Sequence, residues 1–438
     1  MIDNPLDIKN IHRPLFDEFP GLKNIPWIPL MDGIPTPVQE LENFSSRYHG
    51  YRIWIKRDDL TSSIYGGNKP RKYEFLLAEA LKQGKKKIVT AGGIGTNHGL
   101  AAALFANALG LSSKIYMFDQ PLTWSVQRKL LMYPVLGSEI KLVRNYAGLV
   151  FRGLGELLFH PKSFIMLPGG SPLFGLGSAA GSLGFVNAVF ELKQQVDRKE
   201  MPCPEYIAIA CGSTGSASGL ILGCSLTGLD TKVLPVMVSE SIVSNPKVIV
   251  KNCKKILNLM QKHDSTVPDT VIEPGEDFIF LDGFLGSTYG AVTEESQVAV
   301  DTVSELEGGC GFHLDTTYTG KACAAMMDFM ENNESVHGGA RATNMLLWNT
   351  YNSRDLGSFL KDSEMNPTRL PKQFQKYFKE ELTCWGLKKC PSSTRQECPA
   401  FLSVEDRCWL VKAGASGNPA SCKSCPVRNE IERKHYNS

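Results

Sequence analysis

The chain has 438 residues, enough for two or three domains, each with a buried core. Hydrophobic residues make up 42% and charged residues 21% of the chain, which is typical of soluble globular proteins and argues against a disordered or fibrous one. The formal net charge of +2 argues against binding of nucleic acid or an anionic membrane by the chain as a whole. No apolar run reaches the length of a membrane-spanning helix, and the first residues do not read as a secretory signal, so we expect a cytoplasmic protein.

The hydrophobic pattern predicts strands that alternate with helices. The first clear helix starts at Pro70, has apolar residues at helical spacing and ends at Gly84. In chain order, we expect a strand at 51–56, a helix at 70–84, a strand at 87–91, a helix at 97–109, strands at 114–118 and 206–210, a helix up to residue 226, a strand at 232–239 and a helix at 293–306 with Thr293 as its N-cap. This alternation predicts an α/β fold with mainly parallel sheets.

Glycine-rich stretches follow several of the predicted strands. The stretch at 92–99 has His98 where a dinucleotide-binding motif needs its third glycine, and no segment matches a P-loop. The stretch CGSTGSASG at 211–219 precedes a helix and offers backbone N–H groups and the hydroxyls of Ser213, Thr214 and Ser216, so it could bind one phosphate. A tight turn with small residues for packing explains that stretch equally well.

Lys69 stands at the start of the first helix, after two glycines and Asn68 and beside Arg71 and Lys72. Neighbouring positive charge and partial burial lower the pKa of an amine and favour Schiff-base chemistry. The alternative is an ordinary solvated lysine at a helix start.

Six segments together resemble the pyridoxal-phosphate enzymes grouped as D-cysteine desulfhydrases and 1-aminocyclopropane-1-carboxylate deaminases. The segments are KRDDLTSSIYGGNKPRK (56–72), GGIGTNH (92–98), LPGGSPLFGLG (167–177), CGSTGSASG (211–219), TYG (288–290) and LDTTYTGKA (314–322). The resemblance implies a fold of the tryptophan synthase β type (fold type II), with two three-layer α/β domains, the cofactor in the cleft between them, and a homodimer. The larger domain would comprise residues 1–55 and 170–370, the smaller one residues 56–169, and a cysteine-rich tail residues 371–438.

The resemblance also assigns roles to single residues. Lys69 becomes the lysine that bonds to the cofactor aldehyde, and Asn97 the residue that hydrogen-bonds the cofactor's phenolic oxygen. The phosphate cup would consist of Ser213, Thr214, Gly215 and Ser216. Tyr289 and Tyr318 match two tyrosines that flank the substrate, although tyrosines at unassigned positions are more often core residues.

Thr319 bears on the substrate, because the deaminases typically carry Glu after the second tyrosine and the desulfhydrases Thr. A hydroxyl leaves the pyridine nitrogen largely neutral, whereas a carboxylate keeps it protonated and strengthens the electron sink. Thr319 thus favours elimination from a small amino acid, with D-cysteine giving pyruvate, hydrogen sulfide and ammonia. The alternative is deamination of 1-aminocyclopropane-1-carboxylate to 2-oxobutanoate and ammonia.

Two segments depart from the family pattern. Gly95-Thr96-Asn97-His98 stands where the family has Gln-Ser-Asn-His, so Thr96 would supply the hydroxyl that contacts the substrate or acts as base. A His-Thr-Gly-Gly stretch is replaced by residues 349–352, Asn-Thr-Tyr-Asn, in which Thr350 keeps a hydroxyl for the pyridine nitrogen. The two lost glycines put bulk close to the cofactor or substrate.

The tail holds half of the 12 cysteines: Cys384, Cys390, Cys398, Cys408, Cys422 and Cys425. CKSC at 422–425 and the four further thiols fit a thiolate cage for zinc or an iron–sulfur cluster. A metal or disulfide staple for a segment too small to build a core is one interpretation. The other is a metal- or redox-sensing protein on a ligand-binding enzyme scaffold.

Overall fold

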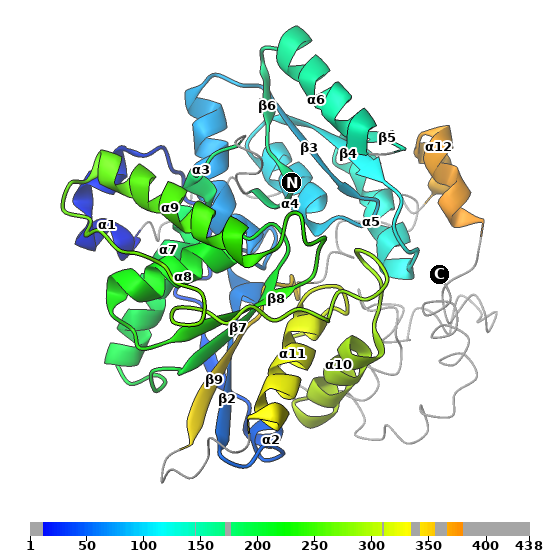
Figure 1. Cartoon of the computed structure of the whole chain (residues 1–438). Coiled ribbons are helices and arrows are strands. Elements are labelled where there is room, and N and C mark those ends of the chain that lie inside the picture. The colour runs from blue at the N-terminus through cyan, green and yellow to red at the C-terminus, as the bar shows by residue number, and fades with distance from the viewer. Residues whose placement is uncertain are drawn as a thin grey trace.

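The computed structural model describes residues 12–144, 146–170, 177–308, 311–333, 342–354 and 366–379. Its strands form two sheets that lie one above the other in Figure 1. The strands are β1 Val38–Glu40, β2 Tyr51–Lys56, β3 Lys87–Gly93, β4 Ser112–Phe118, β5 Glu139–Leu142, β6 Ser163–Ile165, β7 Tyr206–Cys211, β8 Lys232–Met237 and β9 Thr343–Trp348.

The larger sheet has the order β1-β2-β9-β7-β8 and is parallel except for β1, which pairs antiparallel with β2. The smaller sheet has the order β5-β4-β3-β6 and is parallel throughout. These sheets confirm the prediction of an α/β fold with mainly parallel strands.

Helices connect the strands and cover the sheets. They are α1 Leu15–Glu18, α2 Glu42–Ser45, α3 Lys69–Lys82, α4 Asn97–Ala108, α5 Trp124–Val135, α6 Tyr146–Phe159, α7 Ala180–Asp197, α8 Gly215–Thr227, α9 Pro246–His263, α10 Glu294–Leu306, α11 Thr319–Asn332 and α12 Lys372–Gln375. Short 3-10 turns lie at Pro20–Asn24, Asp58–Leu60, Pro168–Gly170, Pro367–Arg369 and Lys376–Phe378. Thr293 caps α10 as predicted, because its side chain accepts from Ser296 N–H.

Alternating side chains of the strands pack against helices on opposite faces, which produces three layers. In β9, Met345 and Leu347 join the core with α10 and α11, whereas Leu346 and Trp348 join the core with α7 and α8. The smaller sheet packs one face against α3, α4 and α5, while Val89 and Tyr116 on the other face contact α6 through Leu149.

Residues 371–379, where the predicted tail begins, pack on the smaller sheet's helices. Phe374 is fully buried in the same core cluster as Leu130 of α5, and Gln127 donates to the Tyr377 carbonyl at 2.6 Å. The six tail cysteines lie outside the described residues.

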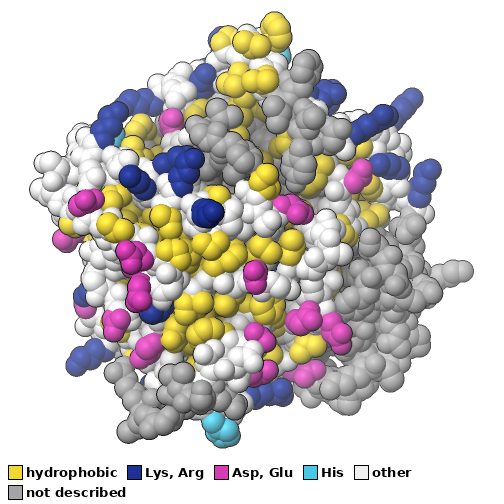
Figure 2. Space-filling model, in the orientation of Figure 1, with side chains coloured by type: hydrophobic (Ala, Val, Ile, Leu, Met, Phe, Trp, Pro, Cys, Tyr) yellow, Lys and Arg dark blue, Asp and Glu magenta, His cyan; other side chains and the backbone are white. Residues whose placement is uncertain are grey.

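The described residues contain no helix long and apolar enough to cross a membrane. The face in Figure 2 carries side chains of both charge signs around a band of hydrophobic ones, in keeping with the small net charge. That face therefore offers no continuous basic surface of the kind that nucleic acids bind.

Candidate active site

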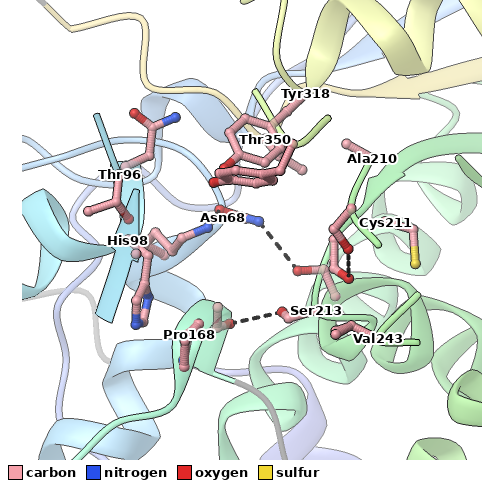
Figure 3. Close-up of a pocket in the computed structure, with 18 of the residues that line it drawn as sticks. Asn68, Thr96, His98, Pro168, Ala210, Cys211, Ser213, Val243, Tyr318 and Thr350 are labelled. Carbon is pink, nitrogen blue, oxygen red and sulfur yellow. Dashed lines mark hydrogen bonds between the residues drawn. The ribbon is translucent and has the colours of Figure 1, made fainter. Parts of the chain in front are cut away.

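A cavity of about 200 Å³ lies where the carboxyl ends of strands from both sheets meet. Gly92 at the end of β3, Cys211 at the end of β7, Ser239 after β8 and Thr350 after β9 all line it. Ligands of parallel α/β sheets bind at this edge, because the loops and helix N-termini gather there. In Figure 3, Thr96 and His98 face Ser213 and Val243 across the cavity, with Tyr318 and Thr350 on a third side.

Lys69 is the first residue of α3 and lines the cavity, as predicted from its motif. Its Nζ donates to Asn68 Oδ1 at 2.7 Å, and the Asn68 amide in turn donates to Ser216 Oγ at 3.4 Å. Burial lowers the pKa of Lys69 to about 8, against the opposing effect of the Asp315 carboxylate. A substantial share of this amine is therefore neutral near pH 8 and can attack an aldehyde.

The loop between β7 and α8 forms an anion cradle. Ser218 N–H makes the first bond within α8, to the Thr214 carbonyl at 2.8 Å, so the N–H groups of Ser216 and Ala217 precede the helical ladder. Ser213, Thr214 and Ser216 line the cavity, whereas Gly215 forms no part of the wall and its N–H donates to the Ser213 carbonyl. The free N–H groups and the helix dipole suit a phosphate.

Thr214 has φ +62°, a left-handed conformation that is costly for a threonine. Hydrogen bonds offset this cost: Thr214 Oγ1 donates to the Ser213 carbonyl at 2.7 Å and accepts from Asn252 Nδ2 at 2.7 Å. The strained turn directs the start of α8 at the cavity.

Two glycines leave room at the cradle. A Cβ on Gly212 would meet nothing closer than Val238 at 3.9 Å, so the bare backbone there leaves space for a ligand. Gly169 has φ +74°, and a Cβ there would collide with Ser213 Oγ. The loop thus fits a phosphate group whose oxygens approach the backbone closely.

Lys72, one helical turn after Lys69, also lines the cavity. Its Nζ donates to the Gly169 carbonyl at 2.8 Å, and burial together with Lys69 lowers its pKa well below the usual value. A phosphate dianion beside it would favour the charged ammonium and offset that effect. The i, i+3 spacing from Lys69 was a signal for this role that the sequence analysis did not use.

The wall opposite the cradle is the start of α4. Thr96 is its N-cap, since Oγ1 accepts from Gly99 N–H at 3.1 Å, and a Cβ on Gly92 would collide with that side chain. Asn97 lines the cavity, and its Oδ1 accepts from Lys129 Nζ at 2.7 Å. The Thr96 hydroxyl therefore serves the helix cap as well as the cavity wall.

Tyr289 and Tyr318 both line the cavity, and their hydroxyls share a hydrogen bond. The two ring centroids lie 6.2 Å apart. Burial, reinforced by Tyr289, raises the pKa of Tyr318 well above its usual value. This hydroxyl thus stays protonated and can act as a proton donor.

Thr319 lies outside the cavity wall, contrary to the prediction that it contacts the cofactor. It is fully buried as the first residue of α11, and its Oγ1 donates to Asp315 Oδ1 at 2.8 Å while accepting from Asp315 N–H. Thr350 does line the cavity, as expected. Tyr351 and Asn352, which replace the family's glycines, line it too, and Asn352 Oδ1 accepts from Gly66 N–H at 2.7 Å.

Other residues of the wall were not predicted from the sequence. Buried His98 is held by hydrogen bonds of its ring to the hydroxyls of Tyr73 and Thr90, and burial keeps its pKa well below the usual value. Glu240 also lines the cavity.

The predicted metal site in the tail lies outside the described residues, as do all six of its cysteines: Cys384, Cys390, Cys398, Cys408, Cys422 and Cys425. Within the described residues no group of three or more metal-ligating side chains is found.

The donor set fits pyridoxal phosphate: a cradle of N–H groups for the phosphate, a buried amine for the aldehyde and hydroxyls around the remaining wall.

Comparison with known proteins supports this assignment. The "Putative 1-aminocyclopropane-1-carboxylate deaminase" of Thermotoga maritima is 32% identical over 309 residues, which cover 68% of this chain and 90% of that protein. A crystal structure of a 1-aminocyclopropane-1-carboxylate (ACC) deaminase homologue superposes with a TM-score of 0.62 at 26% identity, covering 78% of this chain and 95% of that one. Apo diaminopropionate ammonia lyase of Escherichia coli shares the fold, with a TM-score of 0.50 at 14% identity over 74% of this chain and 85% of that one.

The family model described as "Pyridoxal-phosphate dependent enzyme" matches residues 30–343. This range includes Lys69, the α4 start, the cradle and both cavity tyrosines. The chain therefore belongs to the family of pyridoxal-phosphate-dependent enzymes, in its fold type II branch.

Proposed function

We propose that this enzyme is a lyase that removes the β substituent of a small amino acid, and that D-cysteine is its substrate. In this reaction D-cysteine and water give pyruvate, hydrogen sulfide and ammonia. The observation that carries the proposal is the absence of a carboxylate at two described positions. The residue after Tyr318 is a threonine turned toward Asp315, and the β9 end offers the hydroxyl of Thr350.

The bound cofactor supplies an electron sink for the negative charge that develops at the substrate Cα. A hydroxyl beside the pyridine nitrogen leaves this sink weak, because it does not hold a proton there as a carboxylate does. Departure of a thiolate would need less electron withdrawal by the cofactor ring than cleavage of a carbon–carbon bond. A pyridine nitrogen that meets the Thr350 hydroxyl and no carboxylate therefore favours elimination.

Different groups of the cavity have different roles in the proposed reaction. The Ser216 and Ala217 N–H groups, with Lys72, bind the phosphate and fix the cofactor's position. Lys69, whose pKa of about 8 leaves much of the amine neutral, takes the proton from Cα. Tyr318, protonated and hydrogen-bonded to Tyr289, donates a proton at its Oη to the leaving sulfur.

Opening of the 1-aminocyclopropane-1-carboxylate ring to 2-oxobutanoate and ammonia is the second candidate. The name of the Thermotoga maritima relative and the description of the deaminase homologue support it. The tyrosine pair also suits that reaction, because a proton donor is needed at the ring carbon that leaves Cα.

One assay separates the two candidates. The protein, saturated with pyridoxal phosphate, is incubated with D-cysteine, L-cysteine or the cyclic amino acid, and sulfide and 2-oxo acids are measured. We expect sulfide and pyruvate from D-cysteine and a much lower rate from the other two. Release of 2-oxobutanoate from the cyclic substrate without sulfide from D-cysteine would replace our proposal by the second candidate.

Lys69→Ala is the control for the chemistry. This variant should lose the visible absorbance of the bound cofactor and the turnover of D-cysteine together, because the amine that bonds to the aldehyde is gone. A variant that kept both would show that another residue holds the cofactor.

A further inference from the structure

Behind the cavity wall lies a lysine that does not touch the cavity itself. Lys129 on α5 donates from Nζ to Asn97 Oδ1 at 2.7 Å and approaches the Gly95 carbonyl at 3.5 Å. We infer that Lys129 is a positioning residue: it holds the Asn97 amide with its NH₂ group toward the cavity and places a positive charge behind it. This inference deepens the proposed function, on which it rests.

The orientation of the amide follows from hydrogen-bond chemistry. An amide has one accepting oxygen and one donating NH₂ group, whereas a lysine ammonium only donates. Rotation of the Asn97 amide by half a turn would bring its NH₂ group against the ammonium of Lys129, so that two donors face each other and the hydrogen bond between the two side chains is lost. Lys129 therefore excludes that rotamer, and the other end of the amide remains available as a donor.

Asn97 belongs to two cavities. It lines the main cavity with Lys69, and it also lines a small adjoining cavity. The other walls of the small cavity are Tyr65, Ser125, Arg128, Lys129, Met132, Tyr351 and Asn352. Because Lys129 lines only the small cavity, it acts on a ligand of the main cavity through Asn97.

Several groups at this corner favour a negatively charged oxygen. Asn97 is the first residue of α4, so the positive end of the helix dipole adds to its NH₂ group and to the charge of Lys129. Ionisable groups near this corner are Lys69 of α3, His98 of α4, Arg128 of α5, and Tyr65 and Tyr351, and the carboxylate of Asp315 acts on Lys69. The part of the cofactor that matches such a corner is its ring oxygen, next to the carbon that bonds to Lys69.

The consequence is measurable without turnover. Positive charge and a donor at the ring oxygen disfavour a second positive charge nearby, so they lower the pH midpoint at which the bound cofactor's visible absorbance changes. In Lys129→Met we expect this midpoint to rise by about half a unit or more, and the dissociation constant for pyridoxal phosphate to rise about fivefold, as for one lost hydrogen bond.

The variants are chosen to isolate the effect. Lys129→Arg keeps both donor and charge and should return the midpoint to within about 0.2 units of the wild type. Lys82→Met, at the exposed end of α3, removes a lysine from the same domain and should leave both readouts unchanged. In an Asn97→Ala background, Lys129→Met should leave the cofactor affinity within about twofold, because the donor through which Lys129 acts is absent.

An unchanged midpoint and affinity in Lys129→Met, or equal shifts in Lys129→Met and Lys129→Arg, would overturn the inference. The same holds if Lys129→Met weakens the cofactor equally with and without Asn97, since that pattern indicates an effect on the fold. A wild-type protein that binds the cofactor but does not release sulfide would count against the proposed function. The pH midpoint and the cofactor affinity of the Lys129 variants would still decide the role of Lys129. If Lys129→Met does not fold, Lys129→Gln provides the uncharged variant for the same comparison.

Discussion

Glu191 of α7 lies in a buried ionic cluster that holds α3, the helix of Lys69, in place. Its Oε2 accepts from Arg71 at 3.0 Å, and its Oε1 accepts from Lys56 Nζ at 2.7 Å. Arg71 also binds both oxygens of Asp58, at 2.8 and 2.6 Å. Because Arg71 follows Lys69 by two residues on α3, this cluster fixes the start of that helix against the larger sheet.

We predict that Glu191→Gln destabilises the protein by about 3–5 kcal/mol, the usual cost of removing one partner from a buried ion pair. The side chains of Arg71 and Lys56 are fully buried and that of Glu191 is 4% exposed, so water cannot replace the lost carboxylate. The glutamine has nearly the same shape, but it turns an NH₂ group toward donors. With a urea m-value of about 3 kcal/mol/M or more for a chain of this size, the unfolding midpoint should fall by roughly 1 M.

The measurement is urea unfolding of the protein without cofactor, with Glu276→Gln as the control. Glu276 is paired with Lys232 at 3.8 Å and is 79% exposed, so its loss should move the midpoint very little. A shift for Glu191→Gln no larger than that of the control would refute the reasoning.

The effect of Glu191 should also depend on pH. Burial alone would raise the pKa of Glu191, but the charges of Arg71 and Lys56 lower it below its usual value. Its contribution to stability is therefore fully present above the unfolded pKa of about 4.3 and is lost as the pH falls through the lower, folded value. The difference in stability between wild type and Glu191→Gln should be constant above about pH 5 and shrink in stronger acid.

Two further predictions concern the site. Asp315→Asn keeps an acceptor for Thr319 but removes the charge that raises the pKa of Lys69. The rate at which the apoprotein captures pyridoxal phosphate follows the fraction of neutral Lys69 amine, so the pH midpoint of this rate should be near 8 in the wild type and lower in the variant. An identical midpoint in the two proteins would contradict this prediction. Gly169→Ala should weaken binding of pyridoxal phosphate about tenfold or more, because the new Cβ collides with Ser213 Oγ at the cradle. The control Gly228→Ala has a similar φ of +64° and open space, so equal affinities for pyridoxal phosphate in the two variants would show that the cradle is not involved.

The sequence predicted only the elements with a clear local pattern, and helices such as α7 and α9 were not among them. The strand at 51–56 and the helix with its Thr293 cap follow from hydrophobic period and capping residues, and the structure has both. The order of the strands was not predicted. Strand β9 lies between β2 and β7, and no local pattern indicates which distant strand pairs with a uniformly buried one such as β9.

The candidate site likewise contains residues that a local motif predicts and residues that depend on how distant segments pack. Lys69, Asn97 and the 211–219 loop were found because their chemistry is concentrated in short motifs, and the structure brings all three to one cavity. Lys129 could not be found in this way, because its partner Asn97 is 32 residues away and on another helix. The residues behind the wall depend on how helices pack, which a motif does not encode.

Thr319 illustrates a further limit, which concerns neighbours in the chain. Tyr318 and Thr319 are consecutive, yet Tyr318 lines the cavity and Thr319 does not. The reason is local: α11 begins here, and a threonine at a helix start readily bonds a nearby carboxylate, in this case Asp315. A motif therefore identifies which residues stand near a cofactor, but the capping interactions of the helix decide which of them face it. By this argument Thr350, and not Thr319, presents its hydroxyl to the cavity, and substrate assays on Thr350 variants test the proposed contact with the pyridine nitrogen more directly than substitutions at Thr319.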